Sequence, residues 1–297
     1  MDRLRMGLVG AGPWATTVHA AAIEAHPAAE LAGVWARRPE AAAEVAQGTS
    51  ARVHTSLDDL LADVDAVAFA VPPAVQGELA PRAVAAGKHV VLEKPLADDL
   101  ATAERVAQAV ADAGVVSTVV LTLRFDATVR AWVASLPEGP AGPDTVGVGR
   151  WFSGALLGGP FAGSAWRGRH GALLDVGPHV IDLLDAALGP VTGVDRAHRD
   201  GDTGLWTFGL AHAGGARSSV AMSLTVAIDP TEFEIGMFGS AGRHVLTSRP
   251  DDATVPYTTL LDEFVADIAA GRTDGPCSAA RGLHLQRVTE QVAAAAG

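Results

Sequence analysis

Short apolar runs alternate with longer, Ala-rich segments over the first part of the chain. The apolar runs are nearly continuous, as expected for strands that are buried on both faces of a sheet. The segments between them repeat their apolar positions with a helical period. This alternation predicts an α/β domain built on a doubly wound parallel sheet. We expect strands at residues 5–9, 31–35, 66–71, 89–92 and 115–121, and helices at 14–25, 39–47, 73–86 and 99–113.

The pattern changes beyond this part. Residues 138–172 are rich in Gly and Pro, and an apolar helical segment at 173–188 ends at Gly189-Pro190, as a helix stop should. Successive strands with polar or Gly turns then occupy 191–247, which favours an open, mainly antiparallel sheet in an α+β domain. Helices are expected at 258–271 and 278–296. We therefore predict two domains, 1–122 and 123–297.

Composition narrows the class of protein. The 297 residues are 48% apolar, which is typical of folded domains, and the net charge is 22 − 34 = −12 without a basic block. We therefore expect neither a nucleic acid nor a membrane as partner. Cys277 is the single cysteine, which excludes a disulfide framework and suits the cytoplasm. No run approaches the ~18–20 apolar residues of a membrane span, and the other histidines lack metal-ligand spacing.

A glycine turn follows the first predicted strand. Gly10, Gly12 and Ala15 in "GLVGAGPWA" form G-x-G-x-x-A. The first glycine permits a tight turn, the second lets the backbone approach a pyrophosphate, and the alanine allows close packing of helix on strand. The helix N-terminus adds amide donors for the phosphates. The turn predicts a dinucleotide-binding Rossmann domain.

The end of the second strand indicates which dinucleotide is bound. NAD sites usually carry an acidic residue there, which holds the ribose 2′-hydroxyl. This chain reads Ala36-Arg37-Arg38 instead, and two arginines suit a 2′-phosphate. We favour NADP(H), with NAD(H) as the alternative; a solvent-exposed arginine pair is the structural alternative.

Two further segments carry titratable groups. Glu93, Lys94 and Pro95 end the predicted strand at 89–92, where a lysine can stabilise a developing alkoxide. The segment "LLDVGPHVIDLL" places Asp175 four residues before His179, so that both could share one helical face. Pro178 is tolerated there if it lies in the first helical turn; a helix beginning at 173 would be kinked instead. Asp175 could also act only as a helix cap.

Taken together, these motifs resemble those of the Gfo/Idh/MocA oxidoreductases over essentially the whole chain. The resemblance rests on G-x-G-x-x-A, "LEKPLA", "TLRFD", "DVGPHVID", "FGSAGRHVL" and "LLDEFVADIAAGR". It implies a Rossmann domain and a C-terminal domain whose open sheet mediates oligomerisation. It also implies hydride transfer between nicotinamide and a carbinol or carbonyl, commonly of a sugar or cyclitol. The family's lysine matches Lys94, its aspartate Asp175 and its histidine His179.

Some family positions differ here. In the turn after the fourth strand, this chain has Gln76 where the family has a histidine and Pro73 where it has an asparagine. It has Thr122 where the family's N-x-R-F segment has its asparagine. These departures bear on substrate identity more than on redox chemistry. Relatives have a cis peptide before the proline that matches Pro95, and the sequence leaves open whether Lys94–Pro95 is cis.

We therefore expect an oxidoreductase in which His179 exchanges the proton, Lys94 binds the reacting oxygen and Asp175 supports the histidine. Two alternatives stay open, an NAD-dependent glycoside hydrolase of the same family and a non-catalytic nucleotide-binding sensor. The expected partners are a small-molecule substrate and further copies of the chain, in a homodimer or homotetramer formed through the C-terminal sheet. The expected substrate-binding residues are Arg124, Trp166 and Asp182. The expected cofactor-binding residues are Gly10, Gly12, Pro13, Trp14, Ala15, Ala36, Arg37, Arg38, Val71, Pro72, Glu93 and Lys94.

Overall fold

The computed structural model describes residues 3–158 and 165–297. Their contacts form two units. The first consists of Met1–Phe125 and Asp251–Leu283, and the second of Asp126–Pro250 and His284–Gly297. The boundary expected after residue 122 lies close to Phe125. The first unit also takes in a C-terminal segment, which a single boundary does not represent.

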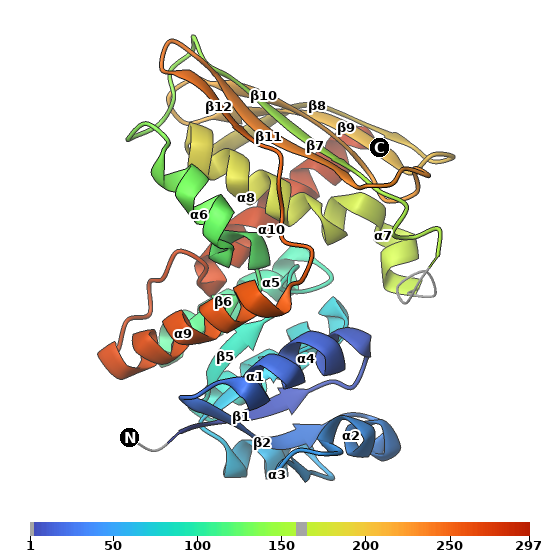
Figure 1. Cartoon of the computed structure of the whole chain (residues 1–297), viewed down its shortest axis with the longest axis vertical. Helices are drawn as coiled ribbons and strands as arrows, with labels where there is room; N and C mark the ends of the chain where they lie inside the picture. The colour runs from blue at the N-terminus through green and yellow to red at the C-terminus, as the bar shows by residue number, and fades with distance from the viewer. Residues whose placement is uncertain (1–2, 159–164) are drawn as a thin grey trace. The chain divides into compact units, whose positions relative to one another are not determined.

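The first unit contains a six-stranded parallel sheet in the order β3-β2-β1-β4-β5-β6 (Figure 1). Its central strand β4 is buried at every residue, which explains the continuous apolar run in the sequence. The predicted doubly wound sheet is confirmed. Only the short strand β3 was not expected, because both of its residues are exposed and carry no apolar period. The strands are β1 (Leu4–Val9), β2 (Ala29–Trp35), β3 (Arg52–Val53), β4 (Ala66–Phe69), β5 (His89–Leu92) and β6 (Ser117–Val119).

The helices expected at 14–25, 39–47, 73–86, 99–113 and 258–271 are present with one change of type, whereas those at Leu57–Asp63 and Thr122–Phe125 were not expected. The helix expected at 14–25 begins as a π-helix, η1, and continues as α1. Helix α10 (Ala279–Ala296) has residues in both units. The others are η1 (Ala15–Ala20), α1 (Ala21–Ala25), α2 (Pro39–Ala46), α3 (Leu57–Asp63), α4 (Pro73–Ala85), α5 (Leu100–Ala113), the 3₁₀-helix η2 (Thr122–Phe125) and α9 (Thr254–Ala270).

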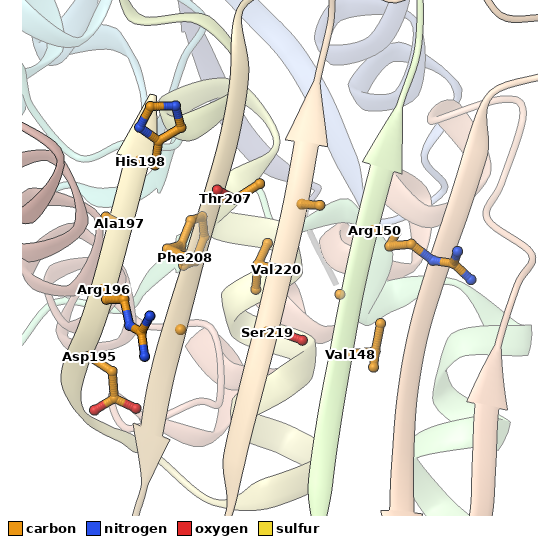
Figure 2. A pocket seen from close by; sticks show the side chains of 13 residues that line it. Val148, Arg150, Asp195, Arg196, Ala197, His198, Thr207, Phe208, Ser219 and Val220 are labelled. Atoms are coloured by element: carbon orange, nitrogen blue, oxygen red, sulfur yellow. The ribbon is translucent and has the colours of Figure 1, made fainter. Parts of the chain in front are cut away.

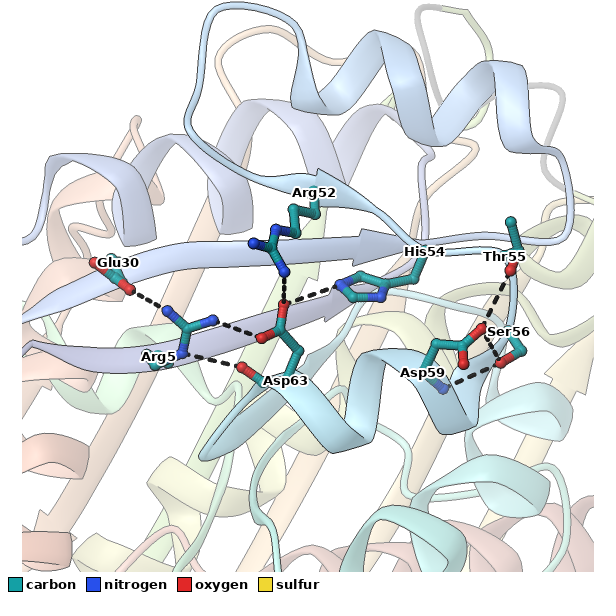
Figure 3. A network of polar contacts seen from close by, with 8 residues as sticks. All are labelled: Arg5, Glu30, Arg52, His54, Thr55, Ser56, Asp59 and Asp63. Atoms are coloured by element: carbon teal, nitrogen blue, oxygen red, sulfur yellow. Dashed lines mark hydrogen bonds and ion pairs between the residues drawn. The ribbon is translucent and has the colours of Figure 1, made fainter.

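A polar network fixes α3, which the sequence did not predict, against β1 and β2 of this sheet (Figure 3). At its start, the Ser56 hydroxyl accepts a hydrogen bond from the Asp59 amide at 3.1 Å. At its end, the Arg5 Nε donates to the Asp63 carbonyl at 3.0 Å, and the same guanidinium pairs with the Asp63 and Glu30 carboxylates. A cation at a helix C-terminus satisfies the last carbonyls and stabilises the helix dipole. Both ends of this short helix are therefore capped.

The second unit contains a six-stranded sheet in the order β12-β11-β7-β10-β9-β8. Its pairs are antiparallel except β7 with β10, which are parallel. The predicted α+β domain with a mainly antiparallel sheet is confirmed, and the crossover from β7 to β10 makes the sheet mixed. The elements are α6 (Ala127–Ala134), β7 (Val146–Phe152), α7 (Ala165–Asp175), α8 (Gly177–Leu188), β8 (Val191–Asp200), β9 (Leu205–His212), β10 (Arg217–Ser223), β11 (Glu232–Gly239) and β12 (Gly242–Leu246).

Helix α8 packs closely on one face of this sheet (Figure 1). The approach depends on glycine in β7, because a Cβ at Gly149 would lie 2.6 Å from Val180. Burial alternates along β9, where Trp206, Phe208 and Leu210 face the core. Within the described part of this unit, no helix lies over the opposite face (Figure 1).

Candidate active site

The glycine turn joins β1 to the π-helix η1. Gly10 has φ +129°, and its amide donates to the Trp35 carbonyl at 3.0 Å. A Cβ at Gly10 would overlap the Ala70 carbonyl oxygen and lie 2.9 Å from its carbon, so this position requires glycine. A Cβ at Gly12 would meet nothing within 4 Å. Gly10 therefore serves the turn itself, whereas Gly12 leaves open space beside the backbone.

A cavity of about 520 Å³ lies beside this turn. Its walls come from the ends of β1, β2 and β4 and the residues that follow them. None of the described residues along it is acidic, and both expected arginines line it with exposed side chains. An apolar wall, a glycine backbone and two guanidinium groups fit an adenine nucleotide with its phosphates. The lining residues are Val9, Gly10, Ala11, Gly12, Trp35, Ala36, Arg37, Arg38, Ala41, Ala70, Val71, Pro72 and Val75.

Seven of the expected cofactor residues line this cavity, and five do not. Pro13, Trp14 and Ala15 follow Gly12 along the chain at the start of η1, where Ala15 is fully buried. Glu93 and Lys94 lie in the turn after β5. A role for these five in binding a cofactor stays a prediction.

Gln76 holds the turn after β5. This fully buried side chain donates from Nε2 to the carbonyls of Glu93 at 2.8 Å and Leu96 at 2.9 Å, and its Oε1 accepts from the Glu93 amide at 2.8 Å. The Lys94–Pro95 peptide is cis. Gln76, noted in the sequence only as a departure from the family, thus fixes the backbone on both sides of Lys94.

The Glu93 side chain lies in a second polar chain of the same unit. Its Oε1 accepts from Trp14 Nε1 at 2.6 Å and contacts His19 Nε2 at 2.9 Å. The other ring nitrogen of His19, Nδ1, lies 2.8 Å from the Tyr257 hydroxyl. Burial raises the pKa of Tyr257 well above its usual 10.0, and the charge of Glu93 raises it further, so the phenol keeps its proton.

The second unit supplies the other candidate catalytic residues. Helix α7 ends at Asp175, and α8 begins at Gly177 with Pro178 in its first turn, so the unkinked geometry is confirmed. The expectation that Asp175 and His179 share one helical face is wrong, because the chain leaves the helix between them. Asp175 also does not cap α8, whose cap position is Val176 without a side-chain hydrogen bond.

His179 is 8% exposed, and its ring lies nearly parallel to Trp151, with the centroids 6.3 Å apart. The guanidinium of Arg249 lies 5.5 Å from the same indole. Trp151 and Arg249 were not found from the sequence. Trp151 lies on β7 in a Gly-rich stretch, and its face of the sheet follows only from the strand register.

The three expected substrate residues are spread over the chain. Arg124 lies in η2 of the first unit, whereas Trp166 and Asp182 lie in α7 and α8 of the second. Asp182 is 1% exposed. Lys94 likewise belongs to the first unit, and Asp175 and His179 to the second. Their substrate and catalytic roles stay predictions.

Two kinds of feature are absent from the described residues, 3–158 and 165–297. No three His, Cys, Asp or Glu side chains among them are grouped so that they could hold a metal ion. None of the helices there combines the length and apolar character needed to cross a membrane.

Comparison with known proteins gives a consistent result. Residues 4–121 match a family model described as "Oxidoreductase family, NAD-binding Rossmann fold". The chain is 30% identical to 1,5-anhydro-D-fructose reductase of Ensifer adhaerens over 263 residues, which cover 83% of this chain and 78% of that protein. It is 42% identical to Dehydrogenase FPY6 of Fusarium mangiferae over 33% of this chain, and the chain spans only about a third (32%) of that relative.

Solved structures share the fold over the full length. Levoglucosan dehydrogenase, in a complex with NADH and levoglucosan, superimposes with a TM-score of 0.85. The match covers 99% of this chain and 97% of that one, at 21% sequence identity. At this identity the likeness establishes the architecture of the chain.

Proposed function

The chain belongs to the Gfo/Idh/MocA oxidoreductase family, and from this premise we propose that it transfers a hydride between a nicotinamide dinucleotide and a carbinol or carbonyl of a small polyhydroxylated molecule. The observation that carries the proposal is the cavity at the glycine turn, with open space at Gly12 and two arginines along its wall. One relative that aligns over most of its length is a reductase of an anhydro-sugar, which supports a sugar-like substrate.

The chemistry divides between cofactor and protein. A bound nicotinamide supplies the site that accepts or donates the hydride. Lys94 donates a hydrogen bond to the reacting oxygen and stabilises the negative charge that develops on it. His179 takes the hydroxyl proton during oxidation and returns it during reduction. Imidazole suits this role because its unperturbed pKa is about 6.5. Asp175 supplies a carboxylate that supports the charged imidazole.

Kinetics of two variants test these roles. Lys94→Ala and His179→Ala should lose kcat by about 100-fold or more while they bind the cofactor with unchanged Kd. Lys88→Ala and His244→Ala are the matched controls, since Lys88 is the only other lysine and His244 lies on β12. If either test variant keeps the wild-type kcat on the true substrate, its proposed role is wrong. Turnover without net change of the cofactor would favour the hydrolase alternative.

We further propose that the cofactor is NADP(H). The guanidinium groups of Arg37 and Arg38 line the cavity, where the described residues provide no carboxylate for a ribose 2′-hydroxyl. NADPH should therefore bind more tightly than NADH in a fluorescence titration, and Arg37→Gln should weaken NADPH by about tenfold. Arg52→Gln, an exposed arginine on β3 outside the cavity, is the control. Equal or reversed affinities for the two cofactors would contradict this assignment.

We also propose that the uncovered face of the second sheet packs on a second copy of the chain. Figure 2 shows this face, where Thr207, Ser219 and Val148 line a shallow cavity of about 600 Å³. Two ion pairs, Arg150–Glu234 and Arg217–Asp195, border this cavity. In a dimer with a two-fold axis, the positive groups of one copy can therefore face the negative groups of the other. Light scattering should therefore give a dimer or tetramer, and Ser219→Arg should dissociate it. A wild-type monomer at micromolar concentration would count against this assembly.

A further inference from the structure

The π-helix η1 allows two side chains five residues apart to reach one carboxylate. Trp14 Nε1 and His19 Nε2 both lie within hydrogen-bond distance of Glu93 Oε1, at 2.6 and 2.9 Å. In an α-helix with 3.6 residues per turn, positions five apart point about 140° away from each other. A π-helix is wider and pairs residue i with i+5, so such positions lie near one face. This convergence on Glu93 therefore depends on the local departure from the α-helix.

For a neutral His19 ring, one arrangement of the hydrogen atoms lets Nε2 donate to Glu93. Tyr257 is fully buried and protonated, and its hydroxyl lies 2.8 Å from His19 Nδ1. A Tyr257 O–H that donates to Nδ1 leaves Nε2 as the protonated nitrogen of a neutral ring, which then donates to Glu93. The opposite tautomer would direct a lone pair at the carboxylate. The hydroxyl thus selects the tautomer that binds Glu93.

Glu93 precedes Lys94, and the backbone on both sides of Lys94 is already held by Gln76. The side chains of His19 and Trp14 add a second restraint to the same turn. We propose that Tyr257 and His19 are positioning residues, which fix Glu93 and thereby the direction in which Lys94 leaves the end of β5. This inference rests on the role given to Lys94 in the proposed function. It assigns to α9, which is far away in sequence, a part in aligning the group that binds the reacting oxygen.

The test uses the small number of lysines. Lys88 and Lys94 are the only two lysines in the chain, so selective labelling of lysine side chains with carbon-13 gives two NMR signals, which Lys88→Arg assigns. Tyr257→Phe removes one hydroxyl and keeps the ring. Ser117→Ala is the matched control, since it removes another buried hydroxyl of the same unit, one that accepts from the Ala279 amide.

Tyr257→Phe should shift the Lys94 signal, leave the Lys88 signal in place, and reduce the fraction of His19 with a protonated Nε2 in nitrogen-15 spectra. It should lower kcat by about tenfold while the Kd of the cofactor stays within about twofold. Ser117→Ala should change neither lysine signal. An unmoved Lys94 signal, or a Nδ1-protonated His19 in the wild type, overturns the proposal.

The positioning role of Tyr257 and the hydride transfer can be refuted independently. A Lys94 signal that moves in a protein without hydride transfer would refute the proposed function and leave the positioning intact. Hydride transfer that is equally fast in wild type and Tyr257→Phe would refute the positioning and leave the proposed function intact.

Discussion

An alanine in place of Gly10 should lower the stability of the fold, whereas an alanine in place of Gly12 should weaken cofactor binding. At Gly10 the backbone has φ +129°, which L side chains rarely adopt, and the new Cβ would overlap the Ala70 carbonyl. Strained backbone costs about 1–3 kcal/mol and overpacking a similar amount. Gly10→Ala should therefore lower the free energy of unfolding by about 2–6 kcal/mol, a large share of the roughly 5–15 kcal/mol typical of a domain.

At Gly12 the φ angle is not positive, and the new Cβ would meet no protein atom within 4 Å. The free energy of unfolding of Gly12→Ala should stay within about 1 kcal/mol of wild type. If the open space receives the pyrophosphate, the methyl group should weaken cofactor binding by about 10- to 100-fold, or about 1.4–2.8 kcal/mol.

Denaturant unfolding of the cofactor-free protein measures the first effect, and fluorescence titration with NADPH and NADH measures the second. Only Gly10→Ala should lose stability, and Gly12→Ala should lose affinity for the cofactor while it stays folded. Wild-type affinity in Gly12→Ala would show that the pyrophosphate does not lie against this residue. Wild-type stability in Gly10→Ala would refute the account of the turn.

Two further predictions concern buried polar groups. Gln76→Leu should lower the free energy of unfolding by about 2–5 kcal/mol, because it leaves the Glu93 amide and the Glu93 and Leu96 carbonyls without their hydrogen-bond partner. The exposed Gln108→Leu is the control, and in the same denaturant unfolding experiment it should cost about 0.5 kcal/mol or less. Burial lowers the pKa of His212 below its ordinary 6.5, so the unfolded chain binds more protons and the free energy of unfolding should fall as the pH drops below 6.5, by up to about 1.4 kcal/mol per unit. Unfolding curves of His212→Gln should show a smaller dependence over this range, and an unchanged slope would contradict the assignment.

Much of the first unit could be predicted because its strands are buried on both faces, so that each one reads as an apolar run. The strand β5 was predicted with its observed bounds, His89–Leu92. The π-helix could not be predicted, because the sequence period of an ordinary helix reveals neither it nor the contacts of Trp14 and His19 with Glu93 that accompany it. The strand β7 was not predicted, because it lies in a Gly-rich stretch; its glycines leave space for the side chains of α8.

The candidate site divides in the same way. Local motifs identified the glycine turn, Lys94 and His179, because each motif is contiguous in sequence. Contacts between distant segments were not accessible, and Tyr257, which reaches His19 across 238 positions, is the clearest case. His19 was the one available signal, since it is a titratable side chain at a buried position of the helix expected at 14–25.

The central claim, hydride transfer by a nicotinamide cofactor, is tested most directly with NADPH that carries deuterium at the reactive carbon of its nicotinamide. The wild type is incubated with a panel of sugars, cyclitols and small ketones, and mass spectrometry locates the deuterium. The account predicts deuterium on the carbinol carbon of a product in wild type and Lys88→Ala, and its loss in Lys94→Ala and His179→Ala. No transfer to any member of the panel, or undiminished transfer in Lys94→Ala, would contradict it.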